Sequence, residues 1–264
     1  MRFSSALAGE FRKARTLPTL TLTTALSAFL MLAFCLLDSS SARATFVEGS
    51  AHFLPGADPA EIGLHGFASL ALFPIIAAVL IASSEHSGGQ ITTSALSVPR
   101  RGQLVLAKLV ISATASAGLG ILMALMVTIS YQSRLVEFSV FATGDAGRHV
   151  IGLGLGIMYW VFLGLISTCA AVVFRSQTAV LAVLVIVSFA GLPLMGIGKV
   201  FEYLPTNAGP TMFMGMDSAY MAIPPTIGPA GAAGVLLAWT AAALLAALLV
   251  FARRDIGSRQ LTIE

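Results

Sequence analysis

Residues 84–108 read SEHSGGQITTSALSVPRRGQLVLAK, a polar and basic segment between two long apolar stretches. The stretch before it covers residues 66–83, and the stretch after it covers residues 104–130. Each is close to or longer than the about 20 apolar residues that an α-helix needs to cross the hydrocarbon core of a bilayer. The polar segment must therefore lie on one side of a membrane, with a transmembrane helix on either side of it.

The composition of the whole chain agrees with this prediction. Of its 264 residues, 57% are hydrophobic and 10% are charged, and its mean hydropathy is +0.90. Soluble domains are typically about 45–50% apolar and about 25% charged. The sequence therefore predicts an integral membrane protein.

Six apolar stretches are long enough to span a bilayer. They cover residues 19–37, 66–83, 104–130, 150–174, 178–197 and 230–251. An α-helix is the expected form, because the strands of a membrane barrel would be shorter and would alternate apolar with polar residues. We therefore predict an all-α membrane protein with six transmembrane helices in a single domain that covers residues 1–264.

The distribution of lysine and arginine predicts that both termini are cytoplasmic. In this orientation 11 of the 15 basic residues lie inside and 4 lie outside. The inner residues are Arg2, Arg12, Lys13, Arg15, Arg100, Arg101, Lys108, Arg175, Arg253, Arg254 and Arg259. The outer residues are Arg43, Arg134, Arg148 and Lys199. The net charge of +3 therefore reflects membrane topology and does not indicate binding of nucleic acid.

Residues 1–17 are predicted to form a helix that lies in the membrane interface. Phe3, Leu7 and Phe11 recur at helical spacing, whereas basic residues occupy the other faces. The alternative is a frayed basic tail that only orients the chain. We expect the first span to be retained, because its apolar run exceeds the about 7–15 residues of the hydrophobic region in a signal peptide.

The six predicted spans contain no Asp, Glu, Arg or His, and Lys108 is their only lysine. Ion-coupled carriers usually have an ionisable group inside the membrane, despite a cost of about 2.5–3.5 kcal/mol. The chain also lacks the G-x-x-x-x-G-K-[ST] motif of ATPases. The glycine series Gly152, Gly154 and Gly156 lies inside an apolar span, where it favours helix packing. We expect the chain not to be an enzyme and to take its energy from another protein.

The polar segment has the features of a short helix parallel to the membrane. A glycine pair at residues 88–89 permits a sharp change of direction, and Pro99 should end the helical stretch that follows. Arg100 and Arg101 would then lie at the carboxyl end of this helix, where positive charge is favourable. Glu85 would need a positively charged partner. The alternative is an ordinary loop whose basic residues only set the topology.

This combination resembles the first cytoplasmic loop of type-2 ABC exporter permeases. The matching residues are Glu85, Gly89, Pro99, Arg100, Arg101 and the Ala107-Lys108 ending. Gln90 stands where the family often has threonine. Glu10 and Lys13 likewise resemble an element of the interfacial elbow helix in this family. The resemblance covers the whole chain in topology, but its motifs cover only residues 10–13 and 85–108.

The resemblance implies a half-transporter permease that moves its substrate outward across the cytoplasmic membrane. Two such chains, identical or different, would pair, and a separate ABC ATPase that carries ATP and Mg would dock on the loop. The implied residues are Glu85, Gly89, Pro99, Arg100, Arg101 and Lys108 for coupling, Glu10 and Lys13 for the elbow, and Phe73, Phe189 and Met195 for the substrate path. The substrate is expected to be an apolar or amphipathic drug, antibiotic, peptide or lipid. A membrane scaffold that recruits a cytoplasmic complex and a secondary carrier are the alternatives.

Residues 197–229, before the last span, contain five prolines and are predicted to form short re-entrant or lid helices on the outer side. Met212, Met214 and Met216 in this segment offer thioethers that suit Cu(I), or a pliable packing surface, which we favour. Histidines and carboxylates in the outer loops do not have the spacing of a standard zinc site. We therefore predict no metal site. Cys35 and Cys169 are expected in opposite leaflets and so without a disulfide.

Overall fold

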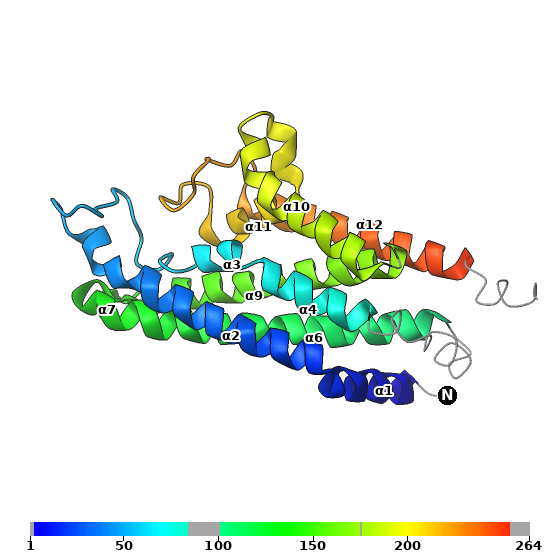
Figure 1. Cartoon of the computed structure of the whole chain (residues 1–264). Helices are drawn as coiled ribbons and strands as arrows, with labels where there is room; N and C mark the ends of the chain where they lie inside the picture. Colours follow the sequence, from blue (N-terminus) through cyan, green and yellow to red (C-terminus); the bar gives the residue numbers. More distant parts are fainter. Residues whose placement is uncertain (1–2, 84–100, 175, 254–264) are drawn as a thin grey trace, which may run out of the picture.

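The computed structural model describes residues 3–83, 101–174 and 176–253 (Figure 1). Within these ranges the regular secondary structure is helical, and no strand occurs. The all-α fold class and the membrane character are therefore confirmed.

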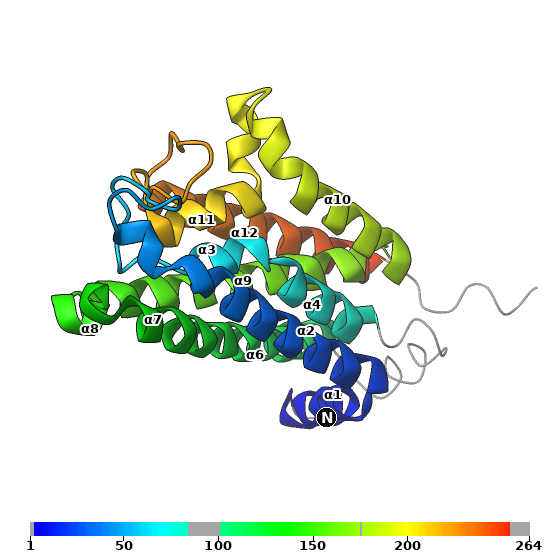
Figure 2. The same ribbon diagram turned by 60° about the vertical axis from the view of Figure 1, so that its left-hand side comes forward.

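Five apolar helices are long enough to cross a membrane, and they match the predicted first, third, fourth, fifth and sixth spans. They are α2 (Pro18–Asp38), α6 (Arg101–Val127), α9 (Ala146–Phe174), α10 (Gln177–Met195) and α12 (Pro229–Arg253). Helix α6 continues through a π-helical turn, η3 (Thr128–Gln132), into α7 (Ser133–Leu135). Helix α9 packs along α4, α6 and α12, whereas α10 runs at an angle and leans away from them toward its carboxyl end (Figure 2).

The predicted second span is not one continuous helix. It is divided into α3 (His65–Ser69) and α4 (Leu72–Ser83). The amide of Phe73 donates to the carbonyl of Leu70 at 3.1 Å, and the next residue, Pro74, has no amide proton. In a continuous helix the ring of Pro74 would clash with that same carbonyl, so the chain turns there. The described part of α4 covers 12 residues, or about 18 Å, and it ends where the described residues end, so the second span is not confirmed.

The helices extend past the predicted spans and include ionisable residues at their ends. Asp38 is the last residue of α2, and Arg148 and His149 lie in the first turn of α9. His149 is buried, with its Nδ1 atom 2.8 Å from the carbonyl oxygen of Ala60. The predicted absence of Asp, Arg and His therefore holds for the middle of these helices, whereas Asp38, Arg148 and His149 lie at helix ends.

The first helix, α1 (Phe3–Thr16), occupies the segment that was predicted to be helical. Leu17 then adopts an extended conformation, and Pro18 stands at the first position of α2, where its missing amide costs no hydrogen bond. The two helices are therefore separate elements joined at one residue. The position of α1 at a membrane surface stays a prediction.

The segment between α10 and α12 forms two short helices, η5 (Lys199–Tyr203) and α11 (Pro205–Met214). Helix α11 is almost entirely buried, against α3, α9 and α12. The carboxylate of Glu202 accepts hydrogen bonds from the amide and hydroxyl of Thr226 and from the amide of Ile227 at 2.9 Å. This carboxylate therefore fastens the loop that leads into α12. The role of the segment as a lid stays a prediction.

The main core lies where α9 meets α3, α6 and α11. The indole of Trp160 donates to the carbonyl of Phe67 at 2.7 Å, and the two rings pack edge to face. Gly156 permits this contact, because a Cβ atom there would lie 2.8 Å from the ring of Phe67. Gly152 meets Leu64 in the same way, whereas a Cβ atom on Gly154 would meet nothing within 4 Å. Two of the three glycines therefore pack helices together.

Two smaller clusters show which helix ends lie together. One joins the start of α6 to the ends of α9 and α12, and the other joins the end of α4 to the end of α9 and the start of α10. These termini lie on the right of Figure 1, together with α1. Short helices in the loops of the opposite end are η1 (Ser39–Ser41), η2 (Arg43–Phe46), η4 (Val136–Phe138) and α8 (Val140–Thr143). Cys35 and Cys169 belong to different clusters, and both are free and buried, as predicted.

Candidate functional site

The predicted coupling residues are described only in part. Glu85, Gly89, Pro99 and Arg100 lie outside the described residues, and Arg101 is the first residue of α6. The contacts of Lys108, two turns further along this helix, are described. They connect the predicted coupling segment to another predicted element.

Lys108 contacts Glu10 of α1, which lies 98 residues earlier in the chain. Its Nζ atom donates to Glu10 Oε2 at 3.1 Å, and the Nζ atom of Lys13 donates to Glu10 Oε1 at 3.0 Å. Only 4% of the Glu10 side chain and 6% of the Lys108 side chain are exposed. The carboxylate thus lies between two ammonium groups, which is the compensation that buried charges require.

Apolar packing supports this ion cluster. Leu7 of α1 packs on Ala107, which is fully buried. Helix α1 is therefore fixed to the beginning of α6 by a charged and an apolar contact, directly after the polar segment that joins α4 to α6.

The predicted substrate-path residues do not line one surface. Phe73 of α4 is partly buried against the main core, whereas 68% of Phe189 on α10 is exposed. Met195 is the last residue of α10. Helices α4 and α10 do contact each other, but through Val79 and Val180, nearer the other end. Phe189 therefore faces away from α4.

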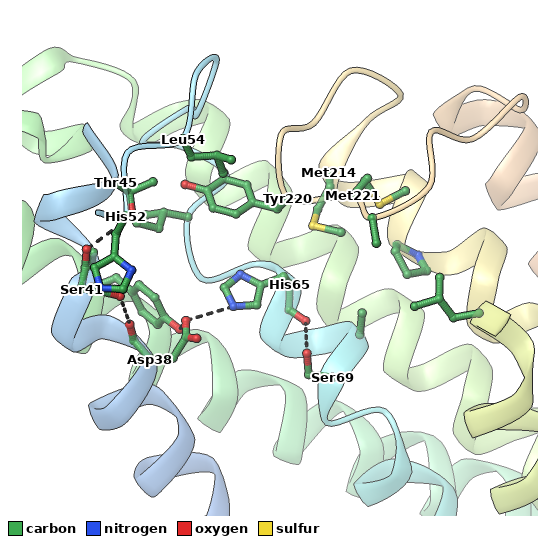
Figure 3. A pocket seen from close by; sticks show the side chains of 17 residues that line it. Asp38, Ser41, Thr45, His52, Leu54, His65, Ser69, Met214, Tyr220 and Met221 are labelled. Atoms are coloured by element: carbon green, nitrogen blue, oxygen red, sulfur yellow. Dashed lines mark hydrogen bonds and ion pairs between the residues drawn. The ribbon is translucent and has the colours of Figure 1, made fainter. Parts of the chain in front are cut away.

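A cavity of about 480 Å³ lies at the end of the molecule opposite α1 (Figure 3). It is lined by Asp38, Ser41, Ala42, Thr45, His52, Leu54, Ile62, His65, Ala68, Ser69, Tyr131, Leu192, Pro210, Met214, Tyr220, Met221 and Ala222. Figure 3 shows Asp38, Ser41 and His52 on one side of the cavity and Met214 and Met221 on the other. The lining is thus polar on one wall and apolar on the opposite wall.

Asp38 holds together side chains from several elements around this cavity. Its Oδ2 atom accepts a hydrogen bond from the hydroxyl of Tyr131 in the π-helical turn, and it lies 3.0 Å from Nε2 of His65 at the start of α3. The His65 ring stacks on Tyr220 with centroids 5.8 Å apart, and it meets Tyr131 edge to face at 6.3 Å. Tyr131 and His65 therefore contact the carboxylate directly, and Tyr220 lies on the other face of the cluster, against His65.

The loops beside the cavity carry further carboxylates. Burial raises the pKa of the Tyr220 hydroxyl, and the charges of Glu61, Asp58 and Asp38 raise it further. Burial also raises the pKa of Glu61. Asp58 forms an ion pair with Arg148 at 2.7 Å.

Sequence reasoning did not identify this cluster. Asp38, His65 and Tyr131 each lie at the outer end of an apolar stretch, and that position was the available signal. Their contacts join residues that are 27 and 93 positions apart. The periodicity of apolar residues in the sequence does not predict contacts between residues so far apart in the chain.

The predicted methionine and histidine candidates are distributed over different environments. Met212 is buried in the main core, Met214 lines the cavity, and Met216 is 40% exposed beyond α11. His52 and His65 both line the cavity. Among the described residues, no group of three or more His, Cys, Asp or Glu side chains is arranged to hold a metal ion.

A comparison with models of protein families finds none that matches this chain, and a comparison with curated proteins finds no significant match. The function is therefore argued from the residues and the geometry described above.

Proposed function

We propose that this chain is the membrane-spanning permease subunit of an ATP-driven exporter that resembles the type-2 ABC class. The contact between Glu10 and Lys108 carries the proposal. The two residues belong to separate motifs, and each motif resembles a functional element of that class. Their contact supports the interpretation that the coupling segment and the elbow helix work as one structural unit.

In this proposal the segment before α6 docks on an ABC ATPase, which binds ATP and Mg. Closure of the ATPase on ATP displaces the segment. Helix α6 follows the segment directly, with Arg101 as its first residue and Lys108 two turns further along. The ion cluster then carries the displacement to α1. A second permease chain completes the transporter, and both termini are cytoplasmic.

The surface of the spanning helices supports an apolar or amphipathic substrate. Among the described residues, Lys108 is the ionisable side chain farthest from a helix end, and it pairs with Glu10. The middle of these helices therefore offers no charge that would bind a small inorganic ion. A drug, antibiotic, peptide or lipid is the substrate class that this surface suits.

A secondary carrier is the second candidate, because of the break between α3 and α4. Discontinuous membrane helices form the binding sites of many secondary transporters. The break here is next to Leu70 and Pro74, and these residues offer no charged side chain. A scaffold that recruits a cytoplasmic complex through the polar segment is the third candidate.

The coupling role is tested with Glu85→Ala, and Glu48→Ala in an outer loop is the matched control. In reconstituted complexes, Glu85→Ala should retain substrate binding but lose transport, and ATP turnover should no longer respond to substrate. Glu48→Ala should transport normally. Normal transport by Glu85→Ala would show that this residue does not couple the two proteins. If no ATPase copurifies with the wild-type chain in mild detergent, the scaffold replaces the exporter as our proposal.

The orientation is tested with single cysteines at Ser50 and Ser258. The native Cys35 and Cys169 are buried, so the wild-type background should remain unlabelled. In intact cells an impermeant maleimide should label Ser50→Cys, and it should label Ser258→Cys only after lysis. Labelling of Ser258→Cys from outside would contradict the cytoplasmic position of the carboxyl terminus.

A further inference from the structure

We propose that the cavity around Asp38 binds an organic cation that carries aromatic or aliphatic groups. The Asp38 carboxylate would receive the positive charge, and the rings and thioethers would surround the apolar body. The inference deepens the proposed function, on which it rests for the step from binding to export, because it names a substrate class and a site for it.

The size and lining of the cavity suit such a ligand. Its volume of about 480 Å³ lies within the about 300–1,000 Å³ of small-molecule sites. Tyr131 and His65 place rings beside the carboxylate, Tyr220 stacks on His65 in the same lining, and aromatic faces attract organic cations. Met214 and Met221 on the opposite wall offer pliable apolar contacts (Figure 3). A bare metal ion would leave most of this apolar lining without a partner.

The charges of the lining favour a cation over an anion. Asp38 is the one carboxylate among the lining residues, which include no lysine or arginine. The lining also contains His52 and His65, and Nε2 of His65 lies 3.0 Å from Asp38 Oδ2. Both of the described contacts of Asp38 are made by Oδ2, and 41% of its side chain is exposed. The carboxylate therefore keeps an oxygen for a ligand in the cavity.

The surrounding loops strengthen this preference. Two arginines in the loops at this end of the molecule, Arg43 and Arg148, form ion pairs with Glu137 and Asp58. The loops assigned to the outer side hold eight acidic residues and four basic residues, a balance of −4. These are Asp38, Glu48, Asp58, Glu61, Glu137, Asp145, Glu202 and Asp217 against Arg43, Arg134, Arg148 and Lys199. Such a field raises the local concentration of cations.

The test compares two probes of the same shape and opposite charge, tetraphenylphosphonium and tetraphenylborate. Each is measured by equilibrium dialysis against the full chain in nanodiscs, and binding to nanodiscs without protein is subtracted. The wild-type chain should bind tetraphenylphosphonium at one saturable site and should show no saturable binding of tetraphenylborate. No ATPase is needed for this measurement.

Asp38→Asn keeps the shape of the side chain and removes its charge, so it should weaken tetraphenylphosphonium binding by about tenfold. Glu137→Gln removes one charge from the same end of the molecule but not from the cavity, and its affinity should stay within about twofold of wild type. Tyr220→Ala, in a loop outside the helices, should also weaken binding. If Asp38→Asn does not fold, the affinity of Tyr220→Ala for tetraphenylphosphonium tests the proposal instead.

Equal binding of both probes, or unchanged affinity in Asp38→Asn or in a folded Tyr220→Ala, would overturn the proposal. Its failure is distinguishable from failure of the exporter assignment. If tetraphenylphosphonium binds at this site but no ATPase copurifies, the proposed binding site is supported and the exporter assignment is contradicted. If the ATPase couples through Glu85 but the probe does not bind, the site alone falls.

Discussion

Gly156→Ala should destabilise the protein, whereas Gly154→Ala on the same helix should not. A Cβ atom on Gly156 would lie 2.8–3.0 Å from three ring atoms of Phe67, well inside the about 3.5–4.0 Å of a normal carbon contact. Phe67 is fully buried between Trp160 and Phe213, so its ring cannot swing away. Gly154 has open space at the same position.

The magnitude follows from two opposing effects. Replacing a helical glycine with alanine stabilises a helix by about 0.5–1 kcal/mol, and this gain applies to both variants. Overpacking a core typically costs about 1–3 kcal/mol, and this cost applies to Gly156→Ala alone. The helix term cancels in the comparison, so Gly156→Ala should have a free energy of unfolding about 1–3 kcal/mol below that of Gly154→Ala.

The contact between Trp160 and Phe67 also provides the assay. The chain has two tryptophans, and Trp239→Phe leaves Trp160 as the fluorescent reporter of this core. Unfolding in dodecyl maltoside micelles by added sodium dodecyl sulfate gives the free energies of the two variants. If Gly156→Ala is as stable as Gly154→Ala, the glycine series does not set the distance between α9 and α3.

Two further predictions concern the segment between α10 and α12. Hydrogen bonds from Thr226 and Ile227 hold the pKa of Glu202 below its ordinary value of 4.5, even though burial by itself would raise it. This contribution to stability is present above pH 4.5 and is lost as the pH falls through the lowered pKa, so Glu202→Gln should flatten the acid limb of thermal stability measured from pH 6 to pH 3. Replacing Met212, Met214 and Met216 with leucine should preserve transport and lower stability by less than about 1.5 kcal/mol per buried site, measured by the same micelle titration. Loss of copper-dependent export at normal protein abundance would instead support a Cu(I) site.

The sequence predicted the long helices well because each is apolar over almost its full length. It missed the division of the second span, although Pro74 was the signal. Proline removes one helical hydrogen bond and clashes with the carbonyl four residues earlier, and an average of hydropathy does not register either effect. The extra first turn of α9, residues 146–149, was missed for a related reason. Arg148 and His149 are polar, but helix formation depends on backbone hydrogen bonds as well as on apolarity.

The candidate sites were predictable to different degrees. The motifs that contain Glu10 and Lys108 were identified separately, but their contact depends on how α1 folds against α6. The cluster of Asp38, His65 and Tyr131 was not predicted, because each residue alone is an ordinary polar group at a helix end. The three residues form one candidate site because they line the same cavity, and this cavity forms only when the helices pack together.

The positions of the ionisable residues also bear on the source of energy. The structure adds Asp38, Arg148 and His149 to the ends of the spanning helices, which weakens an argument from the complete absence of charge. Asp, Glu, Arg and His still avoid the middle of the five long apolar helices among the described residues, where an ion-coupled carrier would need them. Each of the three also has a partner near its helix end, in His65, Asp58 and Ala60 respectively. If the chain is the exporter subunit that we propose, its energy enters at the other end of the molecule, where Lys108 and Glu10 join the start of α6 to α1.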